Sequence, residues 1–183
     1  MMLEIEKKYR CQNAEVFYSR ATITTVSLSD IEELVDLSSN NPRKRVRLCA
    51  HKEPHLPLHE MLIVHERSAY VRPHMHPEKT ESMHIIAGRV DVVIFDHDGE
   101  VTQVIEMGEY ASGLPFYYRL DTPAFHTLII RSDVLVFHET TEGPFQAGAS
   151  AFPAWAPDGA NMILAESYVR DLDQRIKPLL GNL

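Results

Sequence analysis

The chain has 183 residues, a length that suits one domain, and its 26 acidic and 18 basic side chains give a formal net charge of −8. Hydrophobic residues make up 44% and charged residues 24% of the sequence, which excludes a disordered chain. Because an acidic protein repels nucleic acids and anionic membranes, we expect neither as a partner.

The first part of the chain, residues 1–50, predicts a small strand-and-helix extension. Residues 17–28 are rich in Thr, Ile and Val, as strands are. A capping-box pattern from Ser29 to Glu32 then predicts the start of a short helix, which Pro42 should end. We expect this extension to pack on the domain that follows.

Residues 51–145 have the pattern of an all-β barrel or sandwich. Short apolar or alternating runs predict strands, and turn residues separate them. Asp98-Gly99 lies between two Val- and Ile-rich runs and predicts a hairpin. The predicted strands are 61–65, 82–87, 90–96, 101–106, 116–120, 125–131 and 134–140.

Residues 146–183 predict a C-terminal tail or helix. The apolar, proline-punctuated stretch 152–157 should lie extended across the barrel surface. Leu164, Tyr168 and Leu172 have helical spacing, which favours one amphipathic helix, although an irregular tail with a strand in it fits nearly as well. We expect the three parts to form one structural domain.

The cysteine content and the lack of long apolar runs suggest a cytoplasmic protein. Cys11 and Cys49 are too few for a disulfide scaffold, so we expect reduced thiols. The first ten residues do not resemble a signal peptide, and no apolar run approaches the roughly 20 residues that cross a bilayer. We therefore expect no membrane anchor.

The segment from Pro73 to Glu81 predicts three ligands of a metal site. Side chains alternate along a strand, so His74 and His76 project from the same face, and Glu81 opens the next strand beside them. Two imidazoles and a carboxylate suit a transition-metal ion. By the same alternation His84 points away from Glu81 and is not expected to be a ligand.

A fourth ligand is expected from His126. It begins a strand in which Leu128 and Ile130 share its face, and such a position could complete the site. Together the four side chains would hold one divalent transition-metal ion, with Zn, Fe, Mn and Ni all compatible. The alternative is a metal-free barrel in which these groups act only as acids and bases.

These residues resemble the cupin motifs. His74, His76, Glu81 and Gly88 match the first motif, H-x-H-x(3,4)-E-x(6)-G, in spacing, while Pro123 and His126 match the second motif loosely. The resemblance implies an all-β cupin fold, a double-stranded β-helix or jelly-roll barrel. Dimerisation, as a homodimer, is expected by analogy with other cupins.

Seven further segments carry a longer resemblance: 41–45, 48–51, 59–63, 72–88, 92–96, 140–145 and 154–157. Together they resemble the WbuC family, cupin-fold metalloproteins whose genes lie among bacterial O-antigen synthesis genes. The resemblance implies a bound metal and a role in lipopolysaccharide or other surface-polysaccharide biosynthesis, without naming a reaction.

Other side chains are candidates for contact with a small-molecule ligand. Lys79, between the predicted metal ligands, and Tyr118 and Arg119, on the strand before His126, are the substrate-binding candidates. No catalytic residue is assigned from the sequence. Two further groups have undecided roles. One consists of His51, His55 and His59, in an exposed proline-bent connection, and the other of Arg43, Arg45 and Arg47, which could hold a phosphate but are favoured as a solvated edge strand.

Three functions are compatible with this constellation. The first is an enzyme that isomerises or epimerises a sugar or sugar nucleotide. The second is an Fe(II)-dependent cupin dioxygenase. The third is a metal-dependent binding or regulatory protein that senses a carbohydrate intermediate without turning it over. The ligand is expected to be a carbohydrate in each case except the dioxygenase.

Overall fold

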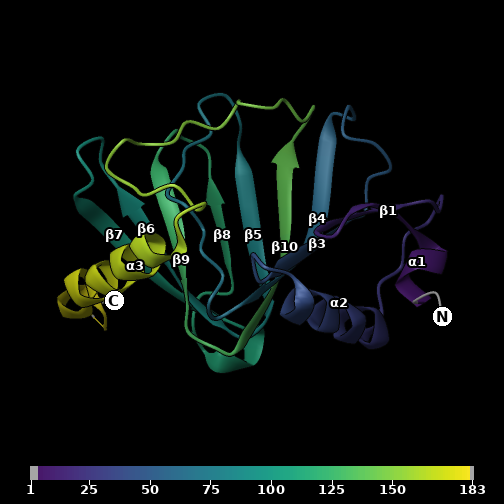
Figure 1. The fold of residues 1–183 in the computed structure, drawn as a ribbon, viewed down its shortest axis with the longest axis horizontal. Coiled ribbons are helices and arrows are strands. Elements are labelled where there is room, and N and C mark those ends of the chain that lie inside the picture. Colours follow the sequence, from purple (N-terminus) through teal and green to yellow (C-terminus); the bar gives the residue numbers. More distant parts are fainter. Residues whose placement is uncertain (1–3, 182–183) are drawn as a thin grey trace.

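The structure is a computed structural model that describes residues 4–181, and it consists of two facing β-sheets with a helix on the outer side of each (Figure 1). The larger sheet has the strand order β1-β2-β3-β4-β10-β5-β8, and the smaller one has the order β7-β6-β9. The elements are α1 (Glu4–Lys8), β1 (Tyr9–Asn13), β2 (Val16–Ser19), α2 (Leu28–Asn40), β3 (Arg45–Cys49), β4 (Leu58–Glu66), β5 (Glu81–Ala87), β6 (Arg89–Phe95), β7 (Val101–Gly108), η1 (Tyr110–Ser112), β8 (Tyr117–Leu120), β9 (Phe125–Ile130), β10 (Val134–Glu142), α3 (Met162–Ile176) and η2 (Lys177–Leu179).

The two sheets face each other in the jelly-roll arrangement that the motif implies. Every strand pair is antiparallel except β2 with β3, and each of the predicted barrel strands is present. Because side chains alternate along a strand, every second one points into the barrel. There Ile63, Ile85, Val92, Leu128 and Phe137 form one buried apolar cluster. The fold is therefore all-β with small helical additions.

The outer face of each sheet is covered by one helix. Leu34 of α2 packs with Val46 and Val64 on the larger sheet, and Leu172 of α3 packs with Val93 and Phe95 on the smaller sheet. In Figure 1 α3 lies at the left and α2 to the right of centre, and the two ends of the described chain lie at opposite ends of the molecule. The helical alternative for the C-terminus is thus confirmed.

The N-terminal prediction is correct in kind but displaced along the chain. The helix begins at Leu28 and not after Ser29, because Ser27 is its N-cap: the Ser27 hydroxyl accepts from the Asp30 amide, and the Asp30 carboxylate accepts from the Ser27 amide at 2.8 Å. Lys8 donates to Asp30 at 2.7 Å and favours this register. The strand predicted over 17–28 ends at Ser19, and β1 was not predicted.

The predicted hairpin at Asp98-Gly99 joins β6 to β7 and lies under the only tryptophan. Gly99 has φ of 88°, and a Cβ there would lie 2.9 Å from the Trp155 ring, so glycine is required on both counts. The Trp155 indole donates to the His97 carbonyl at 3.1 Å and packs against Phe95 and Phe125. The stretch that contains Trp155 therefore lies on the barrel, as expected.

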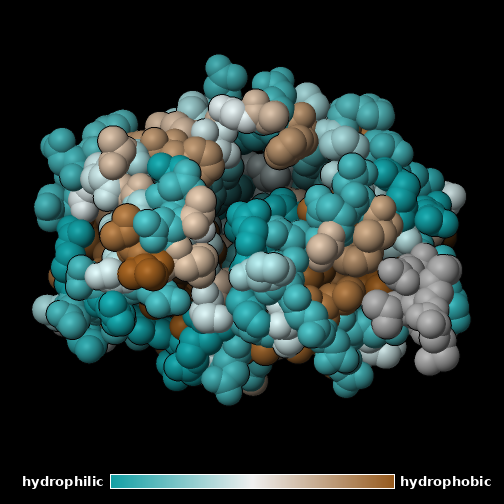
Figure 2. Space-filling view, viewed as in Figure 1, coloured by the Kyte–Doolittle hydropathy of each residue, from teal (hydrophilic) through white to brown (hydrophobic). Residues whose placement is uncertain are grey.

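Within residues 4–181 no helix is both long and apolar enough to cross a membrane. Hydrophobic atoms are nevertheless exposed over α3 (Figure 2), where the side chain of Ile163 is 79% exposed.

Candidate metal centre

The backbone brings His74 and His126 together although they are far apart in sequence. Each donates its amide hydrogen to the carbonyl of the other, at 3.1 Å and 2.9 Å, so the two residues face each other across a short antiparallel bridge. His126 opens β9, whose alternation also turns Leu128 and Ile130 into the barrel. The expected strand around His74 is reduced to this bridge, and the parity argument still holds for His126.

Three imidazoles converge at this point. The potential ligand atoms of His74, His76 and His126 all lie within 4.8 Å of one another. The ring centroids of His74 lie 4.9 Å from His76 and 4.5 Å from His126. Three side chains that the sequence predicted as metal ligands therefore form one compact group.

Hydrogen bonds to the second ring nitrogen orient the three imidazoles. The Nδ1 atom of His74 lies 2.9 Å from the Arg72 carbonyl, and that of His126 lies 3.1 Å from the Ala124 carbonyl. Because a carbonyl only accepts, these bonds place the proton on Nδ1 and leave Nε2 as the free electron-pair donor in the neutral ring. His76 Nδ1 contacts the Ser150 hydroxyl at 3.2 Å, which orients the third ring.

Glu81 flanks two of the three histidines. It opens β5, and its buried carboxylate lies 3.0 Å from Nε2 of His126 and 3.4 Å from Nε2 of His76. The Tyr118 hydroxyl donates to the same carboxylate at 3.0 Å. Burial opposes ionisation of Glu81, but the hydrogen bond from His126 and the neighbouring imidazoles outweigh it and hold the pKa of the carboxyl well below its usual range.

The electrostatics of the cluster hold its members in different protonation states. Burial opposes protonation of His126, but the hydrogen bond to Glu81 and the charge of that carboxylate outweigh it and raise the pKa of His126, so Nε2 of His126 must release its proton to become a ligand. Burial, with help from His126, lowers the pKa of His74 to about 4, so this imidazole is neutral at pH 7. Glu81 is a carboxylate under the same conditions. Three imidazole nitrogens and one carboxylate oxygen are the donor set that Zn, Fe, Mn and Ni accept in proteins, so the residues present fit such an ion.

A cavity of about 710 Å³ adjoins the cluster, within the usual size range of small-molecule pockets. Figure 2 shows the surface hollowed near its upper middle, above the level of α3 and α2. Besides the three histidines and Glu81, the cavity wall contains side chains from both sheets and from the stretch before α3. A ligand inside it would therefore lie against the predicted metal ligands.

Glu139 is a cavity residue that the sequence reasoning missed. It lies on β10 between Met61 of β4 and Met83 of β5, and its half-buried side chain lines the cavity. Burial, together with the negative charge of Glu81, raises the pKa of Glu139 to about 7. The available signal was parity, because Leu135, Phe137 and Glu139 share the inward face of one strand.

The predicted substrate-binding residues lie in different places. Tyr118 lines the cavity beside Glu81, and Lys79 lines it while donating to the Pro144 carbonyl at 2.7 Å. Arg119 is exposed and is not part of the wall, because alternation along β8 turns it outward when Tyr118 points inward. His84 is also exposed, in agreement with its expected orientation.

The second histidine cluster does not converge as a ligand set. The rings of His51 and His59 stack at 4.1 Å, and the Nε2 atom of His59 lies 3.1 Å from the Pro54 carbonyl. His55 is exposed. Their contacts fit the connection between β3 and β4, with His59 also lining the cavity.

Comparison with known proteins adds a family model and several distant structures. A model described as a domain of unknown function, DUF6016, matches residues 26–107, a range that contains His74, His76 and Glu81 but ends before His126. No curated protein matches the chain significantly.

Among solved structures, Bacillus subtilis oxalate decarboxylase, a protein with Mn(II) centres, is 20% identical over 52% of this chain, with a TM-score of 0.42. The oxalate decarboxylase of Lactobacillus farciminis is 14% identical over 52% of the chain, with the same TM-score of 0.42. The capsular polysaccharide assembling protein CapF of Staphylococcus aureus is 14% identical over 62% of the chain, with a TM-score of 0.49. The chain spans 24%, 26% and 30% of these proteins, respectively, and at such similarity their activities do not transfer to it.

Proposed function

We propose that this cupin holds one divalent transition-metal ion on His74, His76, Glu81 and His126 and acts on a sugar or sugar nucleotide. The observation that carries the metal site is the orientation of the three imidazoles: Nδ1 of each is engaged in a hydrogen bond, and their ligand atoms lie within 4.8 Å of one another beside a buried carboxylate. The resemblance to the WbuC family supports a context of bacterial surface-polysaccharide synthesis. The cysteine content and the lack of long apolar runs support a place in the cytoplasm, and analogy with other cupins supports a homodimer.

The proposed reaction is an isomerisation or epimerisation. A bound metal ion would polarise a carbonyl or hydroxyl group of the ligand. Glu139 supports proton transfer, because a carboxyl whose pKa is raised to about 7 by burial and by Glu81 can both accept and release a proton near neutral pH. Tyr118 holds Glu81 in place through its hydroxyl, and Lys79 lies at the cavity wall where it can contact a polar ligand.

The metal site is tested by metal content. Purified tag-free protein and a His74→Ala/His76→Ala double variant are compared by inductively coupled plasma mass spectrometry. We expect close to one metal ion per chain in the parent and none in the double variant. A His84→Ala variant, at an exposed histidine of the neighbouring strand, is the matched control and should retain the metal. Equal, near-zero content in parent and double variant would contradict the proposal.

The reaction type is tested by proton exchange. An isomerase or epimerase that removes a proton from carbon should incorporate deuterium from D₂O into a sugar nucleotide, as measured by mass spectrometry, and Glu139→Gln should abolish incorporation without releasing the metal. Iron as the bound metal, with oxygen consumption in the presence of ligand, would favour the dioxygenase alternative. Binding of sugar nucleotides with neither exchange nor oxygen consumption would favour a binding protein.

A further inference from the structure

The inner face of β3 is charged where a barrel interior is normally apolar. Val46 and Leu48 point outward and pack under α2, so Arg45 and Arg47 point to the barrel side, where both line the cavity. β3 is not an edge strand, because it pairs with β2 on one side and β4 on the other. The sequence-based interpretation of these arginines as a solvated edge strand is therefore wrong.

The arginines exceed the acidic groups that pair with them. Arg43 and Arg45 share one carboxylate, that of Glu15, at 3.2 Å and 3.3 Å. For the half-buried Arg47, no hydrogen bond or ion pair of its guanidinium group is found within residues 4–181. Three positive charges and one carboxylate thus line this end of the cavity, in a protein whose formal net charge is −8.

His65 provides a second, independent sign that this end receives a ligand. Its Cα lies opposite that of Arg45 in the β3–β4 register, and its side chain lines the same cavity. The residue is only 6% exposed, and its Nδ1 atom is buried without a hydrogen-bond partner among the described residues. Buried polar atoms rarely stay unpaired in native proteins, so an oxygen of a ligand or of water is the expected partner.

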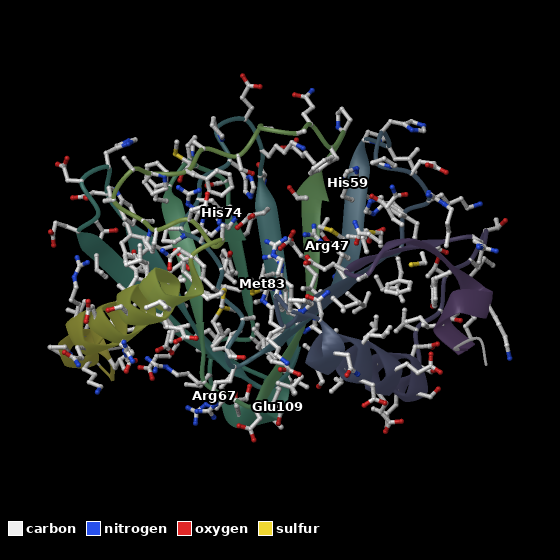
Figure 3. All side chains as sticks on the ribbon, viewed as in Figure 1. Arg47, His59, Arg67, His74, Met83 and Glu109 are labelled. Carbon is white, nitrogen blue, oxygen red and sulfur yellow. The ribbon has the colours of Figure 1, made fainter. Side chains whose placement is uncertain are left out.

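The arginine end and the metal end are separated by the width of two strands. β4 and β10 lie between β3 and β5, so about 14 Å separates β3 from Glu81 on β5 at the usual spacing of roughly 4.8 Å between paired strands. Figure 3 shows Arg47 and His74 both in the middle of the molecule, whereas Arg67 lies at its lower edge. A ligand that fills the cavity can therefore contact both ends at once.

We propose that Arg45, Arg47 and His65 form a binding subsite for the phosphate group of a phosphorylated ligand, with Arg43 at its rim. Guanidinium groups bind phosphate through paired hydrogen bonds, and Arg47 has its donors free for this. This inference deepens the proposed function, on which it rests for the sugar: the ligand is a sugar phosphate or sugar nucleotide, with its sugar at the histidine cluster and its phosphate at β3.

The subsite is tested by isothermal titration calorimetry at low ionic strength with inorganic phosphate, glucose 1-phosphate, glucose and acetate. We expect the two phosphate compounds to bind the parent protein and the His74→Ala/His76→Ala variant, and Arg47→Gln to raise their Kd about tenfold or more. Arg47→Lys keeps the charge but loses the planar pair of donors, so its Kd for the phosphate compounds should lie between those of the parent protein and Arg47→Gln. If Arg47→Gln fails to fold, Arg47→Lys carries the comparison.

Arg67→Gln is the matched control, because Arg67 is exposed outside the cavity and pairs with exposed Asp133 at 3.3 Å. Arg67→Gln changes the net charge by the same amount as Arg47→Gln and should leave the Kd for phosphate unchanged. The inference is overturned if phosphate fails to bind the parent protein or if acetate binds as tightly as phosphate. It is also overturned if Arg47→Gln and Arg67→Gln weaken phosphate binding equally. Loss of phosphate binding in the double histidine variant, with binding kept in Arg47→Gln, would overturn it as well. A parent protein without metal that still binds phosphate at Arg47 would refute the proposed metal function and leave the subsite standing.

Discussion

Burial of His65 should make the stability of the protein depend on pH, and the size of the effect follows from its environment. Burial, with the positive charges of Arg47 and Arg43, lowers the pKa of His65 from 6.5 to about 3. In the unfolded chain the imidazole takes up a proton below pH 6.5, whereas in the folded protein it stays neutral down to about pH 3. Stability from this residue is therefore complete above pH 6.5 and is lost as the pH falls toward 3.

The expected loss is about 2 kcal/mol between pH 8 and pH 5, because the unfolded state binds a proton over the lower half of that interval and the folded state does not. The full displacement corresponds to about 5 kcal/mol, at about 1.4 kcal/mol for each tenfold change in proton affinity. The variant His65→Leu removes the titrating group and keeps a similar side-chain volume. We expect its free energy of unfolding to fall by about 2 kcal/mol less than that of the parent between pH 8 and pH 5.

Urea unfolding followed by circular dichroism at pH 8 and pH 5 measures this difference. His55→Leu is the matched control, because it makes the same substitution at an exposed histidine. Equal losses of stability in the parent and in His65→Leu would refute the reasoning and show that His65 is protonated in the folded protein. Phosphate should be absent from these buffers, since a bound anion beside His65 would favour its charged form.

Three further changes have expected outcomes. Tyr118→Phe removes the hydroxyl that donates to Glu81 at 3.0 Å and should weaken metal affinity about tenfold or more in a competitive chelator titration, whereas Tyr117→Phe on the exposed face should not. Leu172→Ala leaves a hole between α3 and the smaller sheet and should lower the free energy of urea unfolding by about 2–5 kcal/mol, compared with almost no change for exposed Ile163→Ala. Gly99→Ala should destabilise the protein by more than about 1 kcal/mol, seen as a lower Tm, because its backbone is left-handed and Trp155 covers it.

The barrel strands were predictable from sequence because two local signals agree there. Alternating burial and turn residues mark each strand, and in β5 the inward Glu81, Met83 and Ile85 and the exposed His84 follow the predicted parity. The same parity predicted the orientation of His126, Leu128 and Ile130. Local patterns were sufficient wherever one face of a strand is buried.

The N-terminal region was harder to predict because its structure depends on distant partners. Ser27 and Ser29 offer similar capping chemistry, and the choice between them is linked to Lys8, which pairs with Asp30 from outside the helix. Ile23 belongs to a Thr- and Ile-rich run but is 81% exposed. Its side chain therefore gains no burial that would stabilise a strand at this position. That β3 is not an edge strand likewise depends on a distant partner, because β2 of the N-terminal extension pairs with it in parallel.

The place of Trp155 gives the protein an internal optical reporter. As the sole indole in the chain, it is the only residue whose emission is excited selectively at long ultraviolet wavelengths. Its ring packs against Phe125, the residue before His126, and it follows Ser150, which contacts His76, by five positions. Events at the histidine cluster should therefore change its fluorescence, so that loading of the site can be followed in real time without a label.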